Sequence, residues 1–263
     1  MMLRFLAAIV VLCGVAAAGS AQTLPATRPG TVEADTAVPS VGLAPSTQPV
    51  ARDVRWMTRH QLYLDRARQG QIDVVLFGDS LSEGWFDTGR ATWQSRIAIL
   101  RSVCFAIGGD RTEHLLWRLR RGELDGYKAK VVAVMIGSNN LKSVTVSHTV
   151  EETVMGVKAI VEEIRKKQPQ ARVLVLGILP RQPQRYPWIG EKIKKTNEQL
   201  AKLADRETIF FMDMGSRFAD EQGNLVADLY GPDQLHLSTK GYQVWAEEML
   251  PMLRKLLAPP SPF

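Results

Sequence analysis

The fold is decided by residues 72–82, Ile72-Asp73-Val74-Val75-Leu76-Phe77-Gly78-Asp79-Ser80-Leu81-Ser82. The β-branched and aliphatic run at its start has the length of a buried strand, and Gly78 ends that run before a polar turn. Similar runs occupy residues 103–107, 131–136, 173–176 and 209–212, and each also stops at a glycine or a polar residue. The pattern predicts five buried strands.

Helical periodicity fills the intervals between these runs. Apolar residues recur at a spacing of three or four in residues 150–167, 191–205 and 241–257. Strands that alternate with helices predict a parallel sheet with helices on both faces. Ligands of such sheets bind at the carboxyl ends of the strands, so we look for function in the polar residues directly after each run.

Those positions carry the residue types of acyl transfer. Ser80 follows the first run, Gly109 the second and Asn139 the third, and Asp233 precedes His236 by three residues near the C-terminus. A serine hydroxyl becomes a good nucleophile when an imidazole takes its proton and a carboxylate orients that imidazole. We therefore predict Ser80, Asp233 and His236 as catalytic residues. Backbone N–H groups of Ser80 and Gly109 and the amide of Asn139 would form the oxyanion hole.

Three further residues flank these positions directly. Leu81, Ser138 and Leu235 are our candidates for substrate-binding residues that limit the size of the acyl group. Trp85, Phe86 and Trp93 follow the predicted nucleophile, and either one of these rings lines the substrate cleft or all of them pack beneath a loop. The loop at residues 181–190 has the same two interpretations, shaping the alcohol side of the site or packing alone.

In this order and at this spacing, the motifs resemble the SGNH, or GDSL-type, serine hydrolases. Further stretches resemble the platelet-activating-factor acetylhydrolase group of that family, namely residues 107–112, 114–119, 122–124, 168–171 and 175–181. The resemblance spans about residues 72–257 and implies a flavodoxin-like three-layer α/β/α fold with a five-stranded parallel sheet. It also implies a metal-free esterase mechanism that removes small acyl groups. Cys104 and Ala106 depart from the group, in which asparagine and glycine stand there.

The first 21 residues are typical of a secretory signal peptide. Arg4 precedes an apolar run from Phe5 to Val15, and small residues around Ala21 suit cleavage; a retained membrane anchor is the alternative. Residues 22–52 form a linker rich in Pro, Thr and Ser, residues 53–258 the hydrolase domain, and residues 259–263 a Pro-rich tail. We expect an exported protein, periplasmic or extracellular, without stable membrane insertion after cleavage.

Composition argues against several other classes of protein. The net charge is +6, and the densest basic groups are expected on solvated helix faces, so we expect no nucleic-acid partner. These groups are Arg118, Arg120 and Arg121, and Lys192, Lys194 and Lys195. Signal cleavage would leave Cys104 as the one cysteine, and we expect it to be a buried thiol. The four histidines show no close pairing. We therefore expect no metal and no cofactor.

The sequence thus predicts an exported serine esterase that removes acetyl or other short acyl groups through an acyl-serine. Its partner would be a small acylated substrate, an acetylated glycan or a lipid. A lysophospholipase or thioesterase-type acyl hydrolase is one alternative. A catalytically inactive glycan-binding module on the same scaffold is the other, because fold alone does not decide function.

Overall fold

The computed structural model describes residues 45–141, 148–183 and 186–259. The predicted signal peptide, most of the predicted linker and the last four residues lie outside this part, as do residues 184–185 of the predicted substrate loop. The described residues contain a five-stranded parallel sheet of order β2-β1-β3-β4-β5. Its strands are β1 (Val74–Gly78), β2 (Ser102–Ala106), β3 (Val131–Met135), β4 (Arg172–Leu176) and β5 (Ile209–Met212). The predicted fold class is confirmed, within a residue or two at each strand end.

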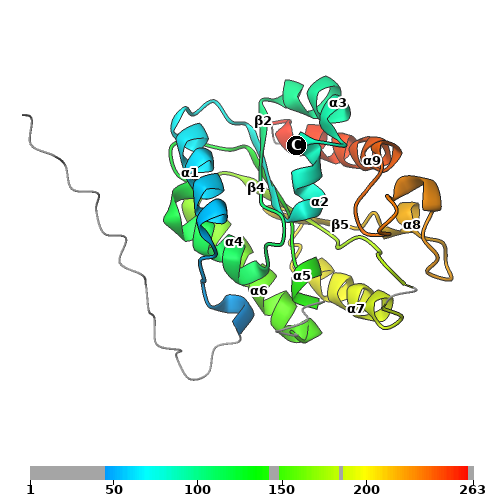
Figure 1. The fold of residues 1–263 in the computed structure, drawn as a ribbon. Coiled ribbons are helices and arrows are strands. Elements are labelled where there is room, and N and C mark those ends of the chain that lie inside the picture. Colours follow the sequence, from blue (N-terminus) through cyan, green and yellow to red (C-terminus); the bar gives the residue numbers. More distant parts are fainter. Residues whose placement is uncertain (1–44, 142–147, 184–185, 260–263) are drawn as a thin grey trace, which may run out of the picture. The chain divides into compact units, whose positions relative to one another are not determined.

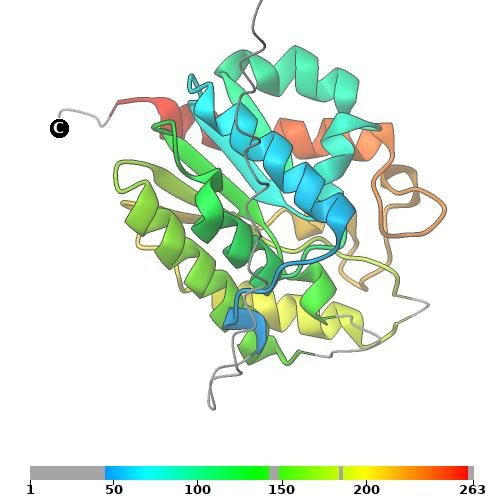
Figure 2. The same ribbon diagram turned by 60° about the vertical axis from the view of Figure 1, so that its left-hand side comes forward.

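Helices cover both faces of the sheet (Figures 1 and 2). On one face lie α1 (Val54–Arg68), α4 (Thr112–Arg118), α6 (Val150–Lys167) and α7 (Ile189–Ala201); on the other lie α2 (Ser80–Glu83), α3 (Arg90–Thr92), α8 (Gly215–Phe218) and α9 (Thr239–Leu257). Shorter elements are α5 (Ser138–Leu141), η1 (Pro45–Thr47), η2 (Gly84–Phe86), η3 (Trp93–Ile97), η4 (Ala98–Leu100), η5 (Leu119–Glu123) and η6 (Ala227–Leu229). No described helix is long and apolar enough to cross a membrane.

Each strand supplies both halves of the core. Along β1, Val75 and Phe77 pack against the α1–α4–α6 side, whereas Val74 and Leu76 pack against the α9 side. This alternation follows from the two-residue period of a strand, and it explains why both sets of side chains are apolar. The result is a sheet buried on both faces, so that polar groups gather where its strands end.

Two helix starts follow from local capping. Helix α9 begins two residues before the predicted position because Gly241 N–H donates to Ser238 Oγ at 3.1 Å, which caps the helix there. Helix α1, which the periodicity did not predict, is capped by Asp53, whose carboxylate accepts the Trp56 N–H at 3.1 Å. Its buried face includes His60 and Tyr63, and these polar side chains hide the helical pattern.

The packed part of the chain begins before the predicted domain boundary at residue 53. Ser46 is fully buried, and its hydroxyl donates to the Glu152 carbonyl at 2.5 Å. The Thr112 hydroxyl donates in turn to the Ser46 carbonyl at 2.9 Å. Hydrogen bonds to α4 and α6, rather than apolar burial, hold this segment, so composition alone placed it in the linker.

Candidate active site

The turn after β1 presents Ser80 at the carboxyl end of the strand. Asp79 is the N-cap of α2, and its carboxylate accepts the Leu81 N–H at 3.1 Å. A Cβ at Gly78 would lie 2.2 Å from the Ser82 hydroxyl oxygen and 2.8 Å from the Met135 carbonyl oxygen. Glycine is therefore required for the helix start to fold this tightly against β3.

Ser80, His236 and Asp233 form one hydrogen-bonded chain. Ser80 Oγ lies 3.0 Å from His236 Nε2, and His236 Nδ1 lies 2.6 Å from Asp233 Oδ2. The other oxygen of Asp233 accepts the backbone N–H groups of Leu235 at 3.0 Å and His236 at 2.9 Å. Partial burial opposes ionisation of Asp233, but the hydrogen bonds from His236 and from these backbone groups outweigh it and lower the pKa of Asp233.

The predicted oxyanion donors lie on the turns after β1, β2 and β3, which are neighbours in the sheet. Gly109 has φ +78°, a conformation that favours glycine, within a turn closed by a hydrogen bond from Asp110 N to the Ile107 carbonyl at 3.1 Å. In the described part of the chain, the backbone N–H groups of Ser80 and Gly109 have no protein acceptor. Asn139 Nδ2 donates to the Asp110 carbonyl at 2.9 Å.

Asn140, the neighbour of Asn139, serves the framework. Its Oδ1 accepts the Thr112 N–H at 2.9 Å, and its Nδ2 donates to Thr112 Oγ1 at 2.9 Å and Glu113 Oε2 at 3.1 Å. Asn140 is fully buried. The two asparagines of α5 thus differ, because Asn139 bonds to the turn after β2 and Asn140 ties α5 to α4.

A cavity of about 410 Å³ opens beside Ser80 and His236. Its other lining residues come from α1, from the end of α2 and the segment after it, and from the C-terminal part of the chain: Arg59, Glu83, Gly84, Phe86, Asp87, Thr88, Leu237 and Tyr242. Of the three candidate rings, Phe86 lines this cavity, whereas Trp85 and Trp93 are buried in the core. Glu83, Asp87 and Thr88 could have been predicted as cavity residues, because they are polar and follow the predicted nucleophile closely in the sequence. Arg59 could not, because nothing in the sequence around it points to the site.

The predicted substrate residues Leu81, Ser138 and Leu235 are not among those that line this cavity. Leu81 and Ser138 are buried, and Leu235 is half-buried. Ser138 Oγ accepts a hydrogen bond from Arg181 Nη1 at 2.7 Å. Arg181 is 3% exposed, and its Nε has no acceptor among the described residues, so the predicted substrate loop begins with a buried cation behind Ser138.

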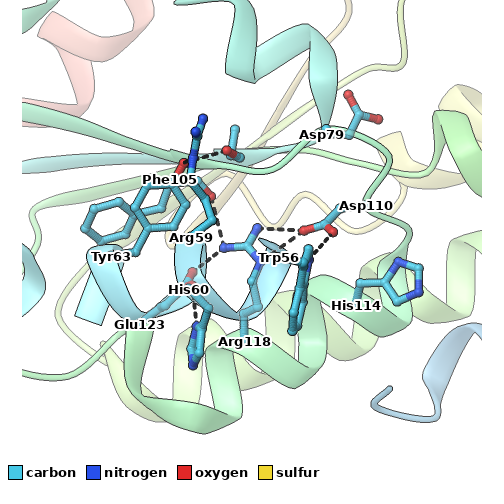
Figure 3. Close-up of polar contacts among 12 residues, drawn as sticks. Trp56, Arg59, His60, Tyr63, Asp79, Phe105, Asp110, His114, Arg118 and Glu123 are labelled. Carbon is cyan, nitrogen blue, oxygen red and sulfur yellow. Dashed lines mark hydrogen bonds and ion pairs between the residues drawn. The ribbon is translucent and has the colours of Figure 1, made fainter. Parts of the chain in front are cut away.

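A cluster of polar side chains surrounds Arg118, with Asp110 and Glu123 on either side of its guanidinium (Figure 3). Arg118, which we expected on a solvated face, is fully buried, and this expectation was wrong; Arg120 and Arg121 are exposed as expected. The guanidinium of Arg118 pairs with the carboxylates of Asp110 and Glu123. Two buried carboxylates thus offset the cost of burying this arginine. Cys104 is also buried, as predicted.

Burial raises the pKa of Asp79 from 3.8 to about 6, against the opposing effects of the Leu81 N–H and Arg181. A carboxyl group whose pKa is higher in the folded than in the unfolded protein lowers the free energy of unfolding at any pH at which it is ionised in both states. The difference corresponds to about 3 kcal/mol. Asp79→Asn should therefore raise the free energy of unfolding at pH 7.5 by up to that amount, and the gain should shrink as the pH falls from 6 towards 4.

Urea unfolding of wild type and Asp79→Asn across this pH range measures the effect. Asp233→Asn is a control of opposite sign, because the pKa of Asp233 is lowered in the fold and its ionised form therefore stabilises it. Asp233→Asn should lower stability at pH 7.5. An Asp79→Asn variant that is no more stable than wild type at pH 7.5 would contradict the prediction.

Comparison with known proteins identifies the class of protein as an acylhydrolase that acts on esters. The chain belongs to the GDSL-like lipase/acylhydrolase family, whose model matches residues 76–244. It is 38% identical over 213 residues to the platelet-activating factor acetylhydrolase IB subunit alpha1 of Rattus norvegicus, covering 80% of this chain and 88% of that protein. It is 32% identical to the rat alpha2 subunit over 214 residues, covering 81% of this chain and 89% of that protein.

Solved structures share the fold. A GDSL-like lipase from Bacteroides thetaiotaomicron superposes with a TM-score of 0.61 at 18% identity, over 76% of this chain and 96% of that one. A lipase/acylhydrolase from Enterococcus faecalis superposes with a TM-score of 0.55 at 20% identity, over 72% of this chain and 99% of that one. At these identities the likeness concerns the fold alone.

Proposed function

We propose that the protein is a serine esterase that hydrolyses short-chain acyl esters, above all acetyl esters, through an acyl-serine intermediate. The observation that carries the proposal is the hydrogen-bonded chain from Asp233 through His236 to Ser80, where Nε2 lies 3.0 Å from Oγ. Two backbone N–H groups without a protein acceptor in the described residues, at Ser80 and Gly109, lie at the ends of neighbouring strands.

In the first half-reaction, Ser80 Oγ attacks the ester carbonyl while its proton passes to His236 Nε2. The carbonyl π electrons move to oxygen, and the N–H groups of Ser80 and Gly109 and the Asn139 amide stabilise the oxyanion. Collapse of this intermediate expels the alcohol, which takes the proton from His236. In the second half-reaction, His236 removes a proton from water as the hydroxide attacks the acyl-serine. Collapse of this second intermediate breaks the bond from the acyl carbon to Ser80 Oγ, which takes the proton back from His236, and the acid leaves.

The surroundings of Ser138 support a short acyl group. Leu81 directly follows Ser80, Ser138 directly precedes Asn139, and both Leu81 and Ser138 are buried. Arg181 Nη1 donates a hydrogen bond to Ser138 Oγ at 2.7 Å. A long alkyl chain placed against this buried guanidinium would be unfavourable. The relative that is 38% identical is named an acetylhydrolase, and this name agrees with a small acyl group.

The cavity beside Ser80 supports a polar alcohol. Arg59, Glu83, Asp87 and Thr88 offer donors and acceptors there, and Phe86, 36% exposed, adds one aromatic face. Arg59 and Glu83 already pair with each other across the wall of this cavity. Hydroxyl groups of a sugar can add hydrogen bonds to these charged groups and to Asp87 and Thr88, whereas a lipid chain would displace water from them without replacing its hydrogen bonds. We therefore favour an acetylated glycan over a lipid as the substrate. Residues 1–21 support export as part of the same proposal, and sequencing the N-terminus of the protein recovered from the periplasm or medium tests it.

Covalent labelling tests the serine mechanism. A fluorophosphonate probe should modify the wild-type protein at Ser80, as read by peptide mass spectrometry, because the reagent captures an activated serine. A folded protein that does not react would favour the glycan-binding alternative. Rates on acetyl, butyryl and octanoyl esters of p-nitrophenol, compared at one pH, should fall with chain length. Highest turnover on the octanoyl ester would instead favour a lysophospholipase or thioesterase.

A further inference from the structure

We infer that Asp110 and Arg118 are positioning residues for the oxyanion hole; the inference rests on the esterase function proposed above. Asp110 follows Gly109 directly and is fully buried. Its carboxylate points toward Arg118 and Trp56 (Figure 3). Its backbone carbonyl accepts Asn139 Nδ2 at 2.9 Å, and its backbone N–H closes the turn onto the Ile107 carbonyl at 3.1 Å. One residue thus adjoins both predicted oxyanion donors that the nucleophile does not supply.

The Asp110 carboxylate is held from three directions. Oδ1 accepts Trp56 Nε1 at 2.7 Å and Arg52 Nη1 at 3.1 Å. Oδ2 lies 3.0 Å from Arg118 Nε and 2.9 Å from Arg118 Nη2. Donors from α1, α4 and the segment before α1 therefore converge on this side chain, which leaves its backbone little freedom to rotate.

Arg118 holds the turn at both of its ends. Besides its pair with Asp110 after the turn, its Nη1 donates at 3.1 Å to the carbonyl of Phe105, in β2 before the turn. The same guanidinium pairs with Glu123, and Glu123 in turn lies 2.6 Å from His60 Nδ1. A planar, permanently charged fork suits this task, since it fixes several acceptors in one plane.

The outer side of the turn is fixed as well. Glu83 Oε2 accepts the Gly108 N–H at 3.0 Å, and Arg52 Nη1 donates to the Gly108 carbonyl at 2.8 Å. The N–H groups of Gly108 and Asp110 are thus paired, whereas that of Gly109, between them, has no acceptor in the described residues. Donors fixed before the reaction are what oxyanion stabilisation requires.

Stability alone does not account for these charges. A buried ion pair is often no more stabilising than apolar side chains of the same volume. An arrangement that orients oxyanion donors acts only when the oxyanion forms, so its loss should lower kcat and leave KM nearly unchanged. A network that serves the fold alone should instead lower the melting temperature and leave kcat of the folded protein intact.

The test compares Asp110→Asn with Glu123→Gln. Both replace a fully buried carboxylate partner of Arg118 by its amide, but among the described residues Glu123 makes no hydrogen bond or ion pair with the Gly109 turn. Well below the melting temperature of each variant, Asp110→Asn should lower kcat on p-nitrophenyl acetate about 10- to 100-fold with KM within threefold, since small misplacements of catalytic groups have effects of this size. Glu123→Gln should keep kcat within about threefold of wild type.

A double-mutant comparison makes the test sharper. In an Asn139→Ala background, Asp110→Asn should lower kcat by a smaller factor than in wild type, because part of its effect passes through Asn139. If Asp110→Asn does not fold, Arg118→Lys replaces it, because lysine keeps the positive charge but lacks the planar guanidinium. Arg118→Lys should show the same loss of kcat, and this loss should again be smaller in the Asn139→Ala background.

Two results would overturn the inference while leaving the esterase in place: an Asp110→Asn kcat within threefold of wild type, or equal losses of kcat in Asp110→Asn and Glu123→Gln. Wild-type turnover that does not depend on Ser80 would overturn the proposed function itself, and the inference with it.

Discussion

Ser80→Ala is expected to lower kcat on p-nitrophenyl acetate by on the order of 10⁴-fold or more. The hydroxyl that His236 Nε2 meets at 3.0 Å is the proposed nucleophile, and alanine leaves no atom to form the acyl-enzyme. The residual rate would come from the oxyanion donors and from substrate binding. Because the side chain is small and not deeply buried, the variant should fold like wild type, which thermal melting checks.

Ser82→Ala is the matched control for this variant. Ser82 lies on the same short helix, and its buried hydroxyl has no hydrogen-bond partner in the described residues. Removing that hydroxyl should therefore leave kcat within about threefold of wild type. Unchanged hydrolysis by Ser80→Ala, measured with the purified protein, would refute the proposed nucleophile.

Asn139→Ala is expected to lower kcat by roughly 10²- to 10³-fold, the loss found when one oxyanion donor is removed. The amide is held at 2.9 Å by the Asp110 carbonyl, so its orientation is set before substrate binds. KM should change little, because the donor interacts mainly with the charge of the transition state. Steady-state kinetics on the acetyl ester measure both constants.

The adjacent asparagine separates this role from a structural one. Asn140→Ala removes hydrogen bonds to Thr112 and Glu113 within the buried framework, so it should lower the melting temperature while the folded fraction keeps most of its kcat. A loss below about threefold in Asn139→Ala would remove the oxyanion role from that residue.

The strands could be predicted from the sequence because their signal is local. A buried strand such as Val74–Gly78 needs an apolar run and a residue that ends it, and both lie within a few positions of each other. The chemistry at the strand ends was also accessible, because parallel strands bring their carboxyl ends to one edge. Ser80, Gly109, Asn139, Asp233 and His236 follow from that rule together with the residue types that acyl transfer needs.

The predictions that failed or fell short depended on ion pairs and hydrogen bonds that form only when the elements pack. Arg118 lies among other basic residues on a helix, and only its pairing with the buried carboxylates of Asp110 and Glu123 in the folded chain explains its burial. Likewise, the segment around Ser46 has the composition of a linker, yet it hydrogen-bonds to residues 66 and 106 positions away. Asp110 and Glu123 lie only eight and five positions from Arg118, but residue type alone does not show that the three side chains turn inward together. The partners of Ser46 leave no trace near it in the sequence.

By itself, the sequence determined the five strands, the three helices at 150–167, 191–205 and 241–257, and the chemical groups at the edge of the sheet, since periodicity and residue type express these locally. Only the tertiary structure decided which of those groups meet, how the Gly109 turn is held, and that the cavity beside Ser80 is lined by Arg59, Glu83 and Asp87. The physical reason is that burial and hydrogen-bond partners arise when elements pack, as when Trp56 reaches Asp110 across 54 positions of the chain.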